Sequence, residues 1–201
     1  MSLEPDISRV LAGRRFELIV IGGSAGGFDA LLTLLPALPA GFGLPAVCIL
    51  HVPDGRDSLL AQLFNERLAL PVREARDKEP IEPGTIYFAG AGYHLSIEQD
   101  RSFSLSCEPP VQYARPSIDV LLESAADAYG AQLAAVLLSG ANHDGADGMA
   151  QVRACGGLTV VQDPREAQSP VMPAQAILRH TPDLVLPLAR IAALLPLLEK
   201  P

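Results

Sequence analysis

Three polar residues that could together form a nucleophilic site stand far apart in this chain. Ser24, His51 and Asp144 each follow, within a few residues, an apolar run of the kind that forms a buried strand. A serine hydroxyl is a weak nucleophile until an imidazole takes its proton, and a carboxylate holds that imidazole in the required tautomer. In a parallel sheet the three strand ends would meet at one edge. The pattern therefore predicts a Ser/His/Asp site at that edge.

The turn that carries Ser24 is unusually rich in glycine. It reads Gly22-Gly23-Ser24-Ala25-Gly26-Gly27 and lies between a predicted strand over 18–21 and a helical pattern over 28–38. Glycines allow positive φ and close approach of a ligand, so we expect the Ser24 hydroxyl to be accessible. The turn fits the G-x-S-x-G pattern of a nucleophile elbow. It lacks the second glycine of the dinucleotide fingerprint G-x-G-x-x-G, which weakens a nucleotide-binding interpretation but leaves it open.

Each of the three residues also has a structural interpretation. Ser24 could cap a helix or bind phosphate, His51 could be a core histidine, and Asp144 could be an ordinary turn residue before a glycine. Two neighbouring residues, His143 and Asp147, compete for the acidic end of the site, and His94 competes for the position of the histidine. A fourth histidine, His180, ends a predicted helix, where a cation is favoured, and is interpreted as structural.

Composition limits the classes of function. The chain has 201 residues, 49% of them hydrophobic, and a formal net charge of −8 with a pI near 4.9. We expect one domain over 16–201 after an N-terminal leader over 1–15, and the acidic charge argues against a nucleic-acid partner. No signal peptide is recognised, and prolines and an arginine interrupt the apolar stretch 184–198, so we expect no membrane insertion and a cytoplasmic location. Neither the three cysteines nor the His and Asp residues show metal-ligand spacing, so no metal or cofactor is expected.

Helical and strand patterns alternate along the chain. The expected strands cover 18–21, 46–50, 71–74, 84–89, 133–138, 158–161 and 184–186, with a hairpin formed by 94–98 and 103–107. Helical patterns lie around 7–11 and over 28–38, from Ser58 as N-cap, from Ser117, over 148–154 and 173–178, and from Leu188. Such alternation predicts an α/β fold with a doubly wound, mostly parallel sheet, that is, a Rossmann-like three-layer sandwich, and an antiparallel hairpin at one side.

The chain order Ser, His, Asp differs from the order Ser, acid, His of the α/β-hydrolases, which disfavours that fold. At these residues the sequence instead resembles the catalytic domain of the chemotaxis protein-glutamate methylesterases, the CheB family. The similarity is collinear over roughly residues 16–198. The resembling segments are Val20-Ile21-Gly22-Gly23-Ser24-Ala25-Gly26-Gly27, Ile49-Leu50-His51-Val52-Pro53, Gly84-Thr85-Ile86-Tyr87, Gly92-Tyr93-His94-Leu95, Arg115-Pro116-Ser117-Ile118-Asp119, Leu138-Ser139-Gly140-Ala141-Asn142-His143-Asp144-Gly145-Ala146 and Met172-Pro173.

The resemblance implies hydrolysis of glutamyl methyl esters on methyl-accepting chemotaxis receptors, with deamidation of receptor glutamines as a second activity. It implies Ser24 as nucleophile, His51 as general base and acid, and Asp144 as the orienting carboxylate. It marks Ala25 and Ala141 as candidate oxyanion or substrate positions, with the backbone N–H of Ala141 as a donor. The implied partners are the cytoplasmic helices of these receptors and, because no receiver domain is recognised in the sequence, a receiver domain on a separate protein.

The sequence departs from the family pattern at two places in these motifs. The common Gly-Ala-Ser-Thr-Gly-Gly is here Gly22–Gly27 with Ala25 in place of Thr, and the common Gly-Met-Gly is Gly140-Ala141-Asn142. Rate and substrate range therefore stay open, and so do two other interpretations. One is a weakly active or inactive relative that binds receptors, and the other is a nucleotide-binding α/β domain.

Overall fold

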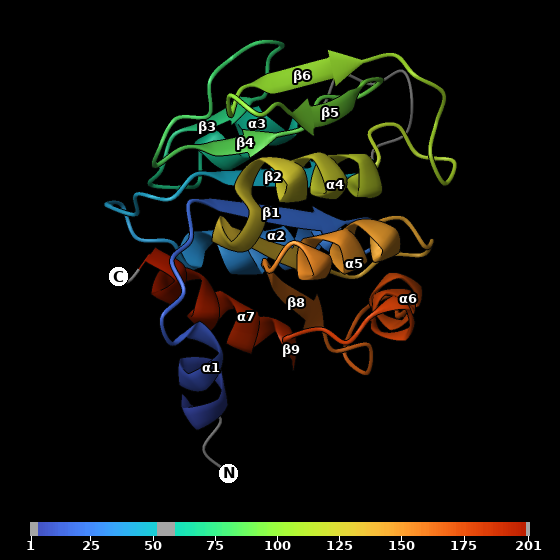
Figure 1. The fold of residues 1–201 in the computed structure, drawn as a ribbon. Coiled ribbons are helices and arrows are strands. Elements are labelled where there is room, and N and C mark those ends of the chain that lie inside the picture. Colours follow the sequence, from blue (N-terminus) through green and yellow to red (C-terminus); the bar gives the residue numbers. More distant parts are fainter. Residues whose placement is uncertain (1–3, 52–58, 200–201) are drawn as a thin grey trace.

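A computed structural model describes residues 4–51 and 59–199 of the chain. A seven-stranded sheet, parallel at every pairing, has the strand order β3-β4-β2-β1-β7-β8-β9 (Figure 1). Its strands are β1 (Leu18–Gly23), β2 (Ala46–Leu50), β3 (Val72–Glu74), β4 (Ile86–Phe88), β7 (Leu133–Leu137), β8 (Leu158–Gln162) and β9 (Leu184–Leu186). A separate antiparallel hairpin consists of β5 (His94–Ile97) and β6 (Phe103–Ser106).

Helices cover both faces of the large sheet. They are α1 (Glu4–Leu11), α2 (Gly27–Leu34), α3 (Leu60–Asn65), α4 (Ile118–Tyr129), α5 (Ala146–Ala154), α6 (Val171–Arg179) and α7 (Leu188–Leu194). Alternate residues of a strand point to opposite faces. Accordingly Ile19 and Ile21 of β1 belong to a core shared with α1, α2, α3 and α7, whereas Leu18 and Val20 belong to a core shared with α4, α5, α6 and the hairpin. The prediction of a doubly wound three-layer fold with a hairpin is confirmed.

The order of the strands creates a switch point between β1 and β7. From β1 the chain proceeds outward through β2 toward β3, and it then returns through α4 to β7 beside β1 before continuing to β8 and β9. Ligands of open α/β sheets bind at the carboxyl ends of the strands at such a point. In Figure 1 this is the edge toward which the arrowhead of β1 points. Ser24 follows β1 at this edge, and the segment 138–145 follows β7.

Several predicted boundaries need correction. The helix expected over 28–38 ends as an α-helix at Leu34 and continues as a 3-10 turn, Leu35–Ala37, because Pro36 provides no backbone N–H. The helices expected over 148–154 and 173–178 begin earlier, at Ala146 and Val171, and the strand expected over 84–89 is shorter, Ile86–Phe88. The proposed N-cap Ser58 lies outside the described residues. None of the helices in the described part of the chain is long and apolar enough to cross a bilayer.

Candidate functional site

A histidine and a buried carboxylate are hydrogen-bonded at the switch point. Nε2 of His51 lies 2.7 Å from Oδ2 of Asp144, although the two residues are 93 positions apart. The His51 side chain is 15% exposed and that of Asp144 is fully buried. Because the Asp144 carboxylate accepts only, Nε2 carries the proton and Nδ1 of the neutral ring is the acceptor. His51 thus has the tautomer in which Nδ1 can take a proton from a neighbouring hydroxyl.

The N-terminus of α4 holds Asp144 in place. Oδ2 also accepts from the backbone N–H of Ile118 at 2.7 Å, while Oδ1 accepts from the N–H of Asp119 at 2.9 Å and from Oγ of Ser117 at 2.8 Å. Burial alone would raise the pKa of this carboxyl group, but hydrogen bonds from His51, Asp119, Ile118 and Ser117 outweigh it, so the pKa of Asp144 is lowered. Asp144 is therefore ionised at neutral pH, as an orienting carboxylate must be.

A second buried carboxylate, that of Asp119, makes the arrangement reciprocal. Its Oδ1 accepts from the backbone N–H of Gly148 in the first turn of α5 at 2.7 Å. Thus Asp144, which lies just before α5, binds the N-terminus of α4, and Asp119, in the first turn of α4, binds the N-terminus of α5. Burial and the nearby negative charge of Asp144 raise the pKa of Asp119 to about 7. Just below pH 7, Asp119 is therefore mostly protonated whereas Asp144 stays ionised, because only the Asp144 carboxylate accepts several hydrogen bonds.

The Ser24 turn is fixed by the loop that follows β7. The N–H of Ser24 donates to the carbonyl of Ser139 at 2.9 Å, and Oγ of Ser139 donates to the carbonyl of Ala25 at 2.7 Å. Gly26 has φ +81°, which glycine adopts without strain, and α2 begins at the next residue, Gly27. Ser24 is partly exposed, in agreement with an accessible hydroxyl.

Ser24 and His51 leave neighbouring strands at adjacent positions. Gly23 of β1 is paired with Leu50 of β2, and the N–H of His51 donates to the carbonyl of Gly23 at 3.4 Å. Paired strands lie about 4.8 Å apart, so the backbones of Ser24 and His51 leave the sheet next to each other. No hydrogen bond joins them within the described residues.

The free nitrogen of His51 faces an amide. Nδ2 of Asn142 lies 3.5 Å from Nδ1 of His51, and Oδ1 of Asn142 is buried without a hydrogen-bond partner among the described residues. The adjacent Ala141, one of the predicted oxyanion positions, is exposed, as is Ala25. Ala25 directly follows Ser24 and Ala141 directly precedes Asn142, so both lie beside residues of the candidate site.

The competing residues are engaged elsewhere. His94 is buried, with Nε2 donating to the carbonyl of Pro109 and Nδ1 accepting from the N–H of Ser117, so it does not take the place of His51. Asp147 is paired with Arg179 at the surface, and His143 is exposed. The expectation of a favoured cation at His180 is wrong, because burial lowers the pKa of its ring and neither ring nitrogen has a partner within the described residues.

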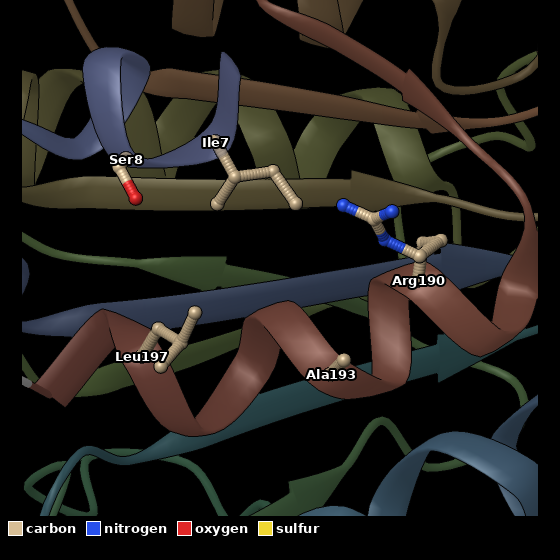
Figure 2. A pocket seen from close by; sticks show the side chains of 5 residues that line it. All are labelled: Ile7, Ser8, Arg190, Ala193 and Leu197. Atoms are coloured by element: carbon tan, nitrogen blue, oxygen red, sulfur yellow. The ribbon is translucent and has the colours of Figure 1, made fainter. Parts of the chain in front are cut away.

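Two hollows lined by described residues lie away from the candidate site. A pocket of about 490 Å³ between α1 and α7 is lined by Ile7, Ser8, Arg190, Ala193 and Leu197 (Figure 2). A shallower one of about 260 Å³ lies against α5 and α6 and includes His143 and Asp147. Neither includes Ser24, His51 or Asp144.

Sequence reasoning missed the contributions of Ser117, Asp119 and Asn142. The first two lie in the segment Arg115–Asp119, which resembles the family pattern, but no local sequence pattern links the start of α4 to Asp144. The signal that could have been used is the N-cap pattern: Ser117 accepts from the N–H of Val120, and such a helix start is a site for a carboxylate. In the sequence, Asn142 stands out only as a departure from the glycine of the family pattern.

A doubly wound parallel sheet, with a histidine hydrogen-bonded to a buried carboxylate at its switch point, defines an α/β protein whose candidate site lies at the carboxyl edge of the sheet. Residues 19–195 match the family model described as CheB methylesterase, and the chain belongs to this family. It is also similar to the crystal structure of the Thermotoga maritima CheB methylesterase catalytic domain, with a TM-score of 0.83 and 32% identity, covering 89% of this chain and 96% of that one.

Sequence relatives agree with this assignment. A Leptospira interrogans protein is 44% identical over 179 residues, covering 89% of this chain and 93% of its own length, and is named provisionally as a protein-glutamate methylesterase/protein-glutamine glutaminase. The Myxococcus xanthus protein-glutamate methylesterase FrzG is 37% identical over 90% of this chain and 54% of its own length. This chain therefore corresponds to nearly all of one relative and about half of the other.

Proposed function

We propose that this chain removes methyl groups from glutamyl methyl esters of methyl-accepting chemotaxis receptors and deamidates receptor glutamines, with Ser24, His51 and Asp144 as the catalytic triad. The observation that carries the proposal is the 2.7 Å hydrogen bond between His51 and a buried, ionised Asp144, next to the glycine-rich turn of Ser24. Membership of the CheB methylesterase family supports the choice of substrate.

In the proposed mechanism Nδ1 of His51 takes the proton of the Ser24 hydroxyl as its oxygen attacks the ester carbonyl. The ring becomes an imidazolium, which the Asp144 carboxylate stabilises through Nε2. Backbone N–H groups of Ala25 and Ala141 are the proposed donors to the oxyanion. His51 then gives its proton to the leaving methoxide, methanol departs, and water hydrolyses the acyl-enzyme on Ser24 by the same proton transfers in reverse.

Methanol release from a methylated receptor fragment tests the proposal. The wild-type chain should release methanol, and Ser24→Ala should lose about 10⁴-fold or more of the activity, since loss of a triad member has an effect of this order. Ser104→Ala on the hairpin is a matched serine control and should keep full activity. Full activity of Ser24→Ala would refute the mechanism, and absence of methanol from the wild type would refute the substrate.

The proposal includes a cytoplasmic location and the receptor helices as partner, since this is where the methylated segments of such receptors lie. The separate receiver-domain partner that the resemblance implies stays a prediction. Adding a phosphorylated receiver-domain protein to the methanol assay and measuring the rate would test it.

A further inference from the structure

A second histidine, His94, is hydrogen-bonded to the helix that holds Asp144. It is the first residue of β5 and is 1% exposed. Its Nε2 donates to the carbonyl of Pro109 at 3.1 Å, and its Nδ1 accepts from the backbone N–H of Ser117 at 3.2 Å. Because a carbonyl only accepts and a backbone N–H only donates, the ring has its proton on Nε2 and a free lone pair on Nδ1.

Ser117 connects this ring to the Asp144 carboxylate. It is the N-cap of α4 and is buried. Its N–H donates to His94, and its Oγ donates to Oδ1 of Asp144 at 2.8 Å. Since Oδ2 of Asp144 accepts from Nε2 of His51, an unbroken chain of hydrogen bonds runs from one histidine to the other.

The two hydrogen bonds of the His94 ring differ in how readily water could replace them. Pro109 lies in an exposed segment, so water can take the place of the ring at its carbonyl. Ser117 is 0% exposed, so its N–H would stay unpaired without Nδ1. A buried donor left unpaired is costly, whereas a solvated one is not. The bond to Ser117 is therefore the one through which His94 acts on α4.

Strand β5 has another hydrogen bond to α4, away from the N-terminus of the helix. The N–H of Ile97 donates to Oγ of Ser124 at 3.1 Å. Ser124 lies about two helical turns beyond Ser117. Removing its hydroxyl would loosen the hairpin from the same helix while leaving the bond between His94 and Ser117 in place.

We propose that His94 is a positioning residue of the catalytic site: by accepting from the N–H of Ser117, it holds the N-terminus of α4 where Asp144 can orient His51. The inference rests on the proposed function. Catalytic groups must be held within about 0.5 Å of their productive geometry by the residues behind them. Loss of the bond from Ser117 to His94 therefore lowers kcat and kcat/KM together, as expected for an effect on the transition state alone.

Two replacements of His94 each keep one half of the ring. His94→Asn places a carbonyl oxygen near the position of Nδ1, so it can accept from Ser117 but does not reach Pro109. His94→Gln places an NH₂ group near the position of Nε2, so it can donate to Pro109 but leaves the Ser117 N–H unpaired.

Methanol release from the methylated receptor fragment measures kcat and KM of both variants. In His94→Gln, kcat should fall about tenfold or more with KM within about twofold of wild type, since a small misplacement of catalytic groups has an effect of this size. In His94→Asn, kcat should stay within about threefold of wild type. Ser124→Ala is the control for hairpin packing and should keep the wild-type kcat.

The rate at which a fluorophosphonate labels Ser24 gives a second measurement, which does not depend on the receptor. It should fall in His94→Gln and be retained in His94→Asn and Ser124→Ala. Should His94→Gln fail to fold by circular dichroism, Ser117→Ala takes its place. That variant lacks the donor to Asp144, so its kcat should fall to a similar extent, and Ser117→Thr should restore it.

Other outcomes overturn the inference. They are a wild-type kcat in His94→Gln or in Ser117→Ala, a kcat in His94→Asn as low as that in His94→Gln, and a raised KM with unchanged kcat. An equal loss in Ser124→Ala would assign the effect to hairpin packing.

Failure of the proposed function is distinguishable from failure of the inference. A wild type that neither releases methanol nor is labelled refutes the function and the inference with it. A wild type that is labelled but releases no methanol refutes the substrate, and the labelling rates then decide the inference.

Discussion

His51 and Asp144 are joined by a 2.7 Å hydrogen bond at the carboxyl edge of the sheet, and the carboxylate is held from behind by the first turn of α4. The histidine thus has one defined tautomer and one defined ring orientation before any substrate arrives. Four predictions follow from this relationship and from the turn beside it.

Replacing Asp144 by asparagine should lower kcat for ester hydrolysis about 10⁴-fold, because the neutral amide neither stabilises an imidazolium nor fixes the tautomer of His51. Methanol release under substrate saturation measures the effect. Asp127→Asn is the control: Asp127 also joins α4 to α5, through Gln151, but at an exposed contact. Equal losses in the two variants would assign the effect to helix packing.

A serine-reactive fluorophosphonate should label Ser24 in the wild type, and His51→Ala should abolish labelling, because the hydroxyl is activated only by the neighbouring imidazole. Mass spectrometry of the labelled peptide identifies the site. Labelling of an unchanged Ser24 at the wild-type rate in His51→Ala would exclude His51 as the base. A wild type that is not labelled at all would favour the inactive receptor-binding alternative.

Alanine at position 26 should destabilise the protein and distort the Ser24 turn. Gly26 has φ +81°, and a Cβ there would lie 2.7 Å from Oε1 of Gln168 and 2.9 Å from Oγ of Ser139. The conformation alone costs an L-residue roughly 1–2 kcal/mol. Urea unfolding should therefore show a loss of at least about 1 kcal/mol, with reduced methanol release.

The matched control for that variant is Gly41→Ala, because an added Cβ at Gly41 meets nothing within 4 Å and φ there is not in the left-handed region. It should change the free energy of unfolding by less than about 0.5 kcal/mol. Similar losses at positions 26 and 41 would contradict the requirement for glycine at the turn.

Asp119→Asn should stabilise the protein more at pH 8 than at pH 5. The folded-state pKa of about 7 exceeds the ordinary 3.8, so the contribution of Asp119 to stability is full below pH 3.8 and is lost as pH rises through 7. Asparagine cannot ionise, yet its carbonyl oxygen can still accept from Gly148. Between pH 5 and the pKa near 7 the difference from wild type should grow by roughly 1.4 kcal/mol per pH unit, and above that pKa it should level off.

Denaturant unfolding at the two pH values measures that difference, with Asp127→Asn as an exposed control on the same helix. A gain in stability that is the same at pH 5 and pH 8 would mean that Asp119 does not change protonation over this range.

The sequence allowed the fold and the positions of three site residues to be predicted because these depend on local patterns. The apolar runs before Ser24, His51 and Asp144 mark strands, and parallel strands place their ends together whatever the details of packing. The glycines around Ser24 also predict a tight turn, and Gly26 has the positive φ expected. The catalytic roles of the three residues, and those of Ala25 and Ala141, stay predictions.

Contacts between distant segments could not be predicted in the same way. Ser117 contacts Asp144 across 27 positions in the sequence, and the proximity of Asn142 to His51 depends on the course of the loop that follows β7. The environment of His180 likewise could not be predicted from its local sequence. Its place at a helix end favours a cation, but the surrounding side chains bury the ring, and desolvation lowers its pKa.

The anchoring of Asp144 to α4 rather than to its own strand has a mechanical consequence. A helix tends to move as a rigid body, so a small displacement of α4 would move Asp144 and with it the His51 ring to which Asp144 is hydrogen-bonded. Helix α4 also contacts the hairpin, because the N–H of Ile97 in β5 donates to Oγ of Ser124 in α4 at 3.1 Å. The hairpin, α4 and Asp144 are therefore linked by consecutive hydrogen bonds, so the orientation of the His51 ring depends on how the hairpin packs on α4.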